Sequence, residues 1–130
     1  MPLAHVSLLR GKPAAHRQAI LDGIYRALRE VFDVPDEDRF MTITEHDAPD
    51  FSYSASYLGI ARGDDLVMIQ ITVSNTRTLE KKKALYRRIV ENLKENPGLR
   101  PEDVLINLVE VSPENWSFGN GIAQYVTDNR

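Results

Sequence analysis

Four short stretches of the sequence have the apolar patterning that is typical of β-strands. The stretch nearest the N-terminus alternates apolar and polar residues, which predicts a strand with one covered face. The third stretch is almost continuously apolar, which predicts a strand covered on both faces. The four stretches are residues 3–9, 40–45, 66–73 and 104–111.

Each pair of strands encloses a segment whose apolar residues recur every three or four positions, which predicts an amphipathic helix. Thr78 precedes the second of these segments as a candidate N-cap. The helices are expected to end before Pro35 and Pro97, since proline cannot continue a helix. The two apolar stripes consist of Ile20, Ile24, Leu28 and Val31, and of Leu85, Ile89 and Leu93.

The second half of the chain repeats the first at a fixed offset of 65 residues. Residues 6–8 fall on 71–73, and residues 37–38 fall on 102–103. The repeats cover about 2–47 and 67–112, so the segment 47–65 and the tail 113–130 are expected to lie outside them. Each repeat has the order strand, helix, strand, which predicts a βαβ unit with parallel strands. We therefore expect one α/β (α+β) domain over residues 1–130, with a four-stranded mixed sheet and two helices on one face.

Two helices can cover only one face of such a sheet. No remaining segment is large enough to cover the other face, so we expect that face to be buried against copies of the same chain. The sequence thus predicts an oligomer.

Composition excludes several classes of function. The 130 residues carry a net charge of −3, which gives no reason to expect binding to nucleic acid or to an anionic membrane. There is no cysteine, so disulfides and thiolate chemistry are absent. No signal peptide or membrane-spanning stretch is apparent, and we expect a cytoplasmic protein. The three histidines have no metal-ligand spacing, so a metal is not expected.

The candidate chemistry begins at the second residue. Pro2 is tolerated as the first residue of a strand, but removal of Met1 would make it a free secondary amine at the end of the sheet. The repeat position of Pro2 is Val67, so the strand itself does not need a proline there. If the two βαβ units are related by a two-fold axis, the start of the first strand, where Pro2 lies, is near Arg77, which follows the third strand. Asp38 is expected to reach this end of the sheet only through the turn before its own strand or from a neighbouring subunit.

Three stretches carry a resemblance to the tautomerase superfamily, and within it to the malonate semialdehyde decarboxylase-like branch. The resemblance covers essentially the whole chain, and the last of the three stretches is its most specific part. The stretches are VFDVPDEDRF at 31–40, GIARGDDLVMIQI at 59–71 and NWSFGNGIAQYV at 115–126.

The resemblance implies a homotrimer that needs no cofactor and binds a small carboxylate-bearing substrate. Pro2 matches the catalytic amine, and Asp38 matches the acid that activates water. Arg77 matches an arginine that binds the substrate carboxylate. Trp116 and Phe118 resemble the hydrophobic wall of the site.

The turn after the third strand departs from the pattern of the decarboxylases, which have two arginines there. The sequence SNTRT supplies only Arg77, and Asn75 stands where the second contact is expected. The reaction therefore stays open at this point. A protonated Pro2 would assist decarboxylation of a 3-oxo acid, and a neutral Pro2 would act as the base of a keto–enol tautomerase. Hydration of unsaturated acids and a non-enzymatic trimeric binding protein are the further alternatives.

Overall fold

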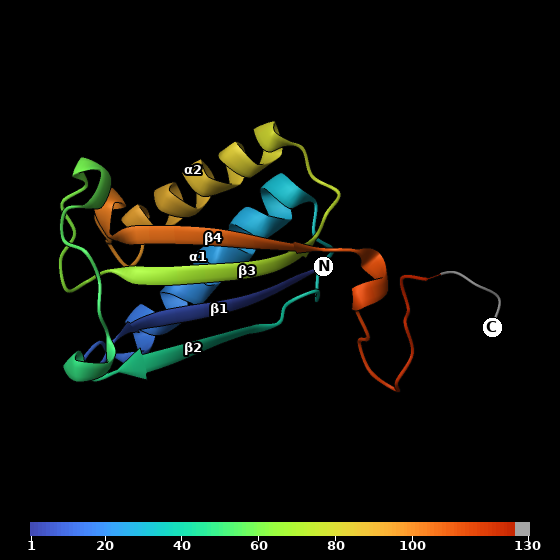
Figure 1. Ribbon diagram of the computed structural model, residues 1–130, viewed down its shortest axis with the longest axis horizontal. Coiled ribbons are helices and arrows are strands. Elements are labelled where there is room, and N and C mark those ends of the chain that lie inside the picture. Colours follow the sequence, from blue (N-terminus) through green and yellow to red (C-terminus); the bar gives the residue numbers. More distant parts are fainter. Residues whose placement is uncertain (127–130) are drawn as a thin grey trace.

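The computed structural model describes residues 1–126 and contains the expected mixed sheet. Its strand order is β2-β1-β3-β4. Strands β1 and β2 are parallel, as are β3 and β4, and the two central strands β1 and β3 are antiparallel (Figure 1). The predicted fold class is confirmed. The strands are β1 (Pro2–Leu9), β2 (Met41–His46), β3 (Val67–Ser74) and β4 (Val104–Val111), and the helices are α1 (Ala14–Phe32) and α2 (Leu79–Glu95).

Both helices pack on the same face of the sheet (Figure 1). Their predicted apolar stripes form the core with alternate residues of the strands, such as Val6 and Ile69, which are fully buried. The side chain of Thr78 accepts a hydrogen bond from the backbone N–H of Lys81 at 3.2 Å, so it is the N-cap of α2. None of the helices in residues 1–126 is both long and apolar enough to span a bilayer.

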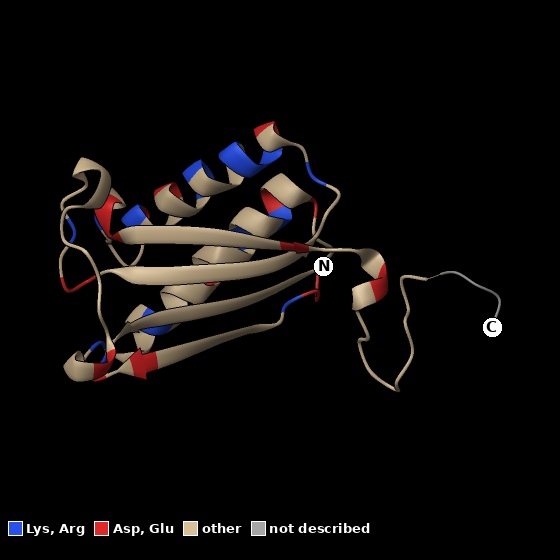
Figure 2. Cartoon of the chain, in the orientation of Figure 1, with Lys and Arg blue, Asp and Glu red and all other residues tan. Residues whose placement is uncertain are grey.

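The opposite face of the sheet is uncovered and nearly free of charge, as the tan strands in Figure 2 show. It is less apolar than the sequence suggested. Strand β3 alternates buried residues with half-exposed Met68 and exposed Gln70, so within one chain it is not covered on both faces. Polar residues on this face bond to one another: Gln70 donates to Asn107 at 3.1 Å, and His5 bonds to Thr42 at 2.7 Å.

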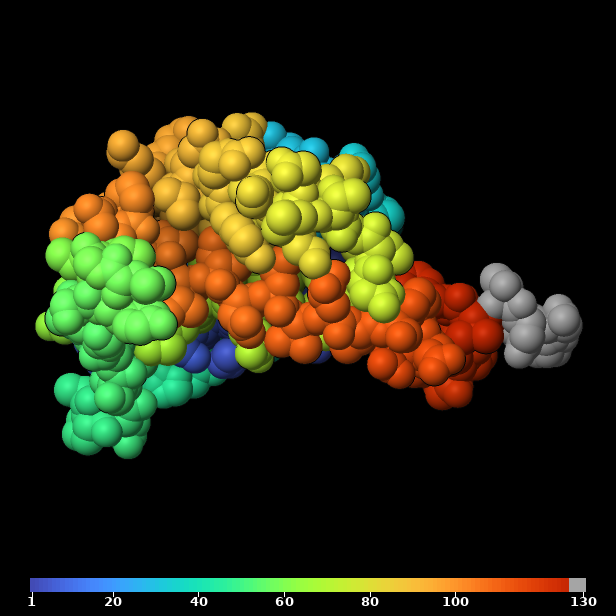
Figure 3. All heavy atoms as spheres, turned by 45° about the horizontal axis from the view of Figure 1, so that its top comes forward, coloured from blue at the N-terminus to red at the C-terminus, as the bar shows by residue number. Residues whose placement is uncertain are grey.

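The structure extends the repeat into the two segments that were expected to lie outside it. A short 3-10 turn, Ala48–Asp50, follows β2, and another, Pro113–Asn115, follows β4 at the same offset of 65. The next residues also correspond, because the sequence Phe-Ser-Tyr at 51–53 falls on Trp-Ser-Phe at 116–118. In both copies the two aromatic rings lie close together, with centroids 5.9 and 5.5 Å apart. These segments lie at opposite ends of the molecule (Figure 3).

Candidate active site

The antiparallel pairing of β1 with β3 brings the start of the chain to the end of β3. Pro2 is opposite Val73 in this pairing, and Arg77 follows β3 by three residues. The sequence therefore predicted correctly that Pro2 and Arg77 lie at the same end of the sheet. Asp38 joins them through the turn that connects α1 with β2, and its Oδ2 is 3.9 Å from the Met1 amino nitrogen. No neighbouring subunit is needed to supply this carboxylate.

Helix α1 holds the guanidinium of Arg77. Arg77 donates a hydrogen bond to the backbone oxygen of Phe32 at 2.9 Å. Its guanidinium carbon also lies 4.7 Å from the centre of the Phe32 ring, which is a cation–π distance. Phe32 is the last residue of α1, where unpaired carbonyl groups favour a positive charge. The end of the helix and the ring together orient Arg77.

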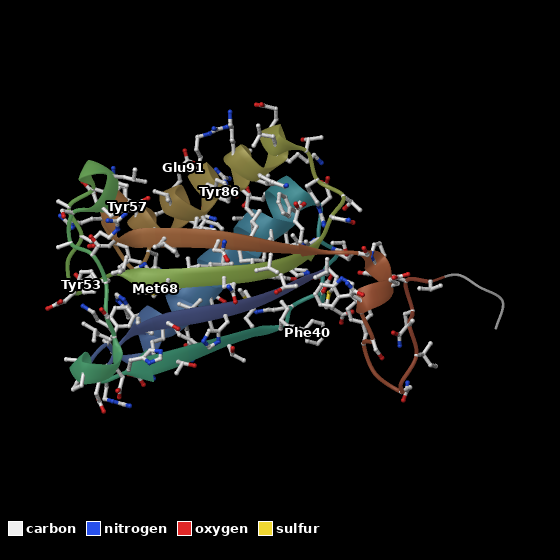
Figure 4. The ribbon with its side chains drawn as sticks, viewed as in Figure 1. Phe40, Tyr53, Tyr57, Met68, Tyr86 and Glu91 are labelled. Atoms are coloured by element: carbon white, nitrogen blue, oxygen red, sulfur yellow. The ribbon has the colours of Figure 1, made fainter. Side chains whose placement is uncertain are left out.

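A cavity of about 450 Å³ opens beside this group, within the size range of small-molecule sites. The stacked rings of Trp116 and Phe118 form one wall, and the indole N–H of Trp116 donates to Ser74 at 3.1 Å. Phe40, on the segment leading into β2, points toward the tail from the other side (Figure 4). The complete lining is Met1, Leu3, Phe40, Thr72, Val111, Asn115, Trp116, Ser117 and Phe118.

Met1 occupies the centre of the site. It is 9% exposed and lines the main cavity and two smaller hollows beside it. One hollow includes Arg77 in its lining, and the other includes Asp38. While Met1 is attached, the nitrogen of Pro2 is an amide nitrogen, which is neither basic nor nucleophilic. Removal of Met1 would join the three hollows and free that nitrogen.

Burial shifts the ionisable groups at this end of the sheet. It lowers the pKa of the Met1 amino group below its ordinary value; Asp38 opposes this shift and Arg77 adds to it. Burial also raises the pKa of Asp38, against the effect of the amino group and Arg77. One oxygen of Asp38, Oδ1, is buried without a hydrogen-bond partner among the described residues. An amine and a carboxyl group with pKa values drawn toward each other are suited to moving a proton.

Tyr125 also belongs to this site, although it was not among the candidate residues from the sequence. Its ring packs edge-on against Phe118 at 4.8 Å, and it lines both of the smaller hollows. Burial raises the pKa of Tyr125, and the Asp38 carboxylate raises it further. The signal available in the sequence was its place in the aromatic tail motif 115–126.

Asn75 lies apart from the group formed by the other candidates. Its side chain is exposed and lines none of these three hollows, and its backbone N–H bonds to Val111 at 2.9 Å. The structure thus places Asp38, Arg77, Trp116 and Phe118 around the start of the chain. It does not bring the side chain of Asn75 there. Within residues 1–126, no cluster of three or more histidines and acidic residues has a geometry that could hold a metal ion.

Comparisons with known proteins agree with this fold. A family model described as tautomerase enzyme matches residues 38–119. The probable tautomerase YusQ of Bacillus subtilis (strain 168) is 37% identical over 126 residues, which are 97% of this chain and 99% of that protein. The probable tautomerase YrdN of the same organism is 34% identical over 127 residues, 98% of each chain.

Two solved structures of malonate semialdehyde decarboxylases are also similar. One, studied for its decarboxylase and hydratase activities, has a TM-score of 0.89 at 31% identity and covers 95% of each chain. The FG41 enzyme inhibited by 3-bromopropiolate has a TM-score of 0.89 at 36% identity, over 95% of this chain and 93% of that one. The chain belongs to the tautomerase family. Within it, the chain is similar to the malonate semialdehyde decarboxylases.

Proposed function

We propose that this chain is a cofactor-free enzyme that uses Pro2 as its N-terminal amine, after removal of Met1, and decarboxylates a small 3-oxo acid such as malonate semialdehyde. The observation that carries the proposal is the position of the chain's start between a carboxyl group and a guanidinium. The Met1 nitrogen is 3.9 Å from Asp38, and both its pKa and that of Asp38 respond to Arg77.

In this reaction Arg77 binds the substrate carboxylate with its planar guanidinium. The protonated amine of Pro2 donates a hydrogen bond to the 3-oxo group. The bond between the carboxylate carbon and carbon 2 breaks, carbon dioxide leaves, and the electron pair forms an enolate that the oxo group stabilises. A proton then passes to carbon 2, and acetaldehyde is the other product. The Pro2 ammonium supplies that proton and regains one from solvent through the Asp38 carboxyl group, and the rings of Trp116 and Phe118 shield the enolate.

Keto–enol tautomerisation of phenylpyruvate-type substrates is the second candidate. A specific observation favours it: burial lowers the pKa of the Met1 amino group, one residue before the Pro2 nitrogen, and an amine that is neutral there is a base rather than an acid. The names of the two relatives from Bacillus subtilis point the same way.

We further propose that the enzyme is a homotrimer. The uncovered face of the sheet is almost free of charge, and burying it against other copies would remove its apolar side chains from water. A fused 4-OT protein described as a symmetric trimer has the same fold, with a TM-score of 0.77 at 22% identity. Asn75, which lies outside the described hollows, stays a candidate second contact for substrate in that assembly.

The test begins with the mass of the purified chain, which shows whether Met1 has been removed. A sample with Pro2 at its N-terminus is then assayed for carbon dioxide and acetaldehyde from malonate semialdehyde, and for ketonisation of phenylenolpyruvate. Pro2→Ala is expected to lose at least about a hundredfold in turnover while keeping its oligomeric state, as a group in proton transfer should. A processed sample that turns over neither substrate would contradict the enzymatic proposal and favour a trimeric binding protein.

A further inference from the structure

A second pocket lies at the end of the sheet opposite the candidate active site. Its volume is about 230 Å³, and segment 47–65 forms its outer wall. In Figure 4, Tyr53, Tyr57 and Met68 lie together at this end, and Phe40 marks the other. The lining consists of Ser52, Tyr53, Ser54, Tyr57, Arg62, Leu66, Met68 and Leu105.

This pocket is the repeat counterpart of the active-site cavity. Five of its lining residues correspond to residues of that cavity at the offset of 65. Both pockets therefore have a floor of three apolar side chains, from strands or from the residues directly before them, and an outer wall that includes serine and an aromatic ring. The five pairs are Leu66 with Met1, Met68 with Leu3, Leu105 with Phe40, Ser52 with Ser117, and Tyr53 with Phe118.

The groups that carry the proposed chemistry are missing from the second pocket or are already paired. Where the first has the N-terminus, the chain here continues into Val67 through an ordinary amide. Asp103, the counterpart of Asp38, accepts hydrogen bonds from Gly63 at 2.8 Å and from Arg100 at 3.1 Å. Lys12, the counterpart of Arg77, forms an ion pair with Asp65 at 2.5 Å. The second pocket has a binding surface without a reactive group.

The charges around this pocket disfavour an anion. Arg62 donates from one nitrogen to the backbone oxygens of Ser54, Tyr57 and Ile60 at 3.1–3.3 Å. These bonds stabilise the segment that forms the outer wall of the pocket. The phenol of Tyr53 donates to Asp64 at 2.7 Å. That carboxylate, together with Asp103, offsets the charge of the guanidinium. In the first site, by contrast, Arg77 has no ion pair among residues 1–126 and is available for a carboxylate.

We infer that the second pocket binds a small uncharged aromatic molecule and does not transform it. The flat rings of Tyr53 and Tyr57 can pack against an aromatic ligand, and Leu66, Met68 and Leu105 supply an apolar floor. The volume is below the usual 300–1,000 Å³ of ligand sites, so one ring is the appropriate size. The inference is independent of the reaction proposed for Pro2.

The test compares two probes of similar size, 4-fluorophenol and 4-fluorobenzoate, on the processed full chain. Fluorine NMR titration measures total binding of each probe. Trp116 is the single tryptophan of the chain and lines the first pocket, so its fluorescence reports binding at that pocket alone. The phenol is expected to bind at a site that leaves Trp116 fluorescence unchanged. The benzoate is expected to bind only where Trp116 fluorescence responds.

Two variants test whether the silent site, which binds the phenol without changing Trp116 fluorescence, is the second pocket. Tyr53→Ala removes a ring from the wall and leaves the uncovered face of the sheet, the proposed contact between copies, unaltered. Tyr57→Ala removes a wall residue that is 66% exposed. Each variant is expected to weaken the silent phenol binding at least about tenfold and to leave the response of Trp116 unchanged. If all phenol binding quenches Trp116, or if neither variant affects the silent binding, the inference is wrong. Loss of turnover in Pro2→Ala would have no bearing on this result.

Discussion

Asp38 and Asp103 occupy the same position in the two repeats, yet their carboxyl groups are in opposite environments. Asp38 is half-buried near an amine and has a buried oxygen without a partner among the described residues. Asp103 is 2% exposed and is bonded by Arg100 and by the backbone of Gly63. Burial raises the pKa of Asp38. Burial alone would also raise the pKa of Asp103, but the bonds from Arg100 and Gly63 outweigh it and lower that pKa.

Replacing each of these aspartates with asparagine should therefore have opposite consequences. A lowered carboxyl pKa stabilises the fold above the unfolded pKa of about 4, and this stability is lost as pH falls through the folded pKa. Asp103→Asn should thus lower the free energy of unfolding at pH 7 by roughly 1–3 kcal/mol, as expected for a lost charge-assisted hydrogen bond.

For Asp38 the sign is reversed. A raised carboxyl pKa stabilises the fold below the unfolded pKa, and this contribution is lost as pH rises through the folded pKa. Asp38→Asn should leave stability at pH 7 unchanged or slightly higher, while turnover falls at least about a hundredfold. Urea unfolding at pH 4 and 7, with an assay of each variant, checks both expectations. An equal loss of the free energy of unfolding in Asp38→Asn and Asp103→Asn would contradict the predicted difference between the two carboxyl groups.

Arg77→Lys should weaken substrate binding while preserving the fold. Lysine keeps the positive charge near the end of α1 but has no planar fork for a carboxylate and stacks less well on the Phe32 ring. KM is expected to rise about 10–100-fold, the equivalent of one hydrogen bond to a charged group. Steady-state kinetics measures KM, and thermal melting is the control. Arg100→Lys serves as the matched change at an arginine outside the site, and it should leave KM unaltered.

Tyr125→Phe tests the residue that the sequence did not single out. The change keeps the ring that packs on Phe118 and removes only the hydroxyl group. Because this hydroxyl lies where Asp38 and Arg77 both influence its pKa, its loss should reduce kcat/KM about tenfold. Tyr86→Phe on α2 is the matched control, since Tyr86 lines none of the site hollows described above. If kcat/KM is unchanged in Tyr125→Phe, the hydroxyl group has no part in the reaction and Tyr125 only packs against Phe118.

The sequence predicted most of what the repeat controls. The mixed four-stranded sheet, the shared helix face and the position of Pro2 and Arg77 at one end of the sheet follow from two βαβ units and a two-fold axis, because these depend only on periodicity and chain direction. The distance between Asp38 and the N-terminus depends on the conformation of a turn, and apolar periodicity does not specify that. The place of Tyr125 likewise depends on how an irregular tail folds back on Phe118. The correspondence of segment 51–53 with 116–118 rests on the matching 3-10 turns before them, which apolar periodicity does not specify.

The pH dependence of turnover should separate the two reactions proposed for Pro2. An unperturbed α-amino group titrates near pH 8. Burial and Arg77 lower the pKa of the Met1 amino group, one residue before Pro2, and Asp38 raises it; we expect the free Pro2 amine to shift in the same directions. If Pro2 is a base, kcat/KM should rise with pH through a midpoint below 8; if it is an acid, kcat/KM should fall through that midpoint. In either case, Asp38→Asn should move the midpoint to lower pH and Arg77→Lys should leave it nearly unchanged, because lysine retains the charge. A midpoint that Asp38→Asn does not move would show that the titrating group is not this amine.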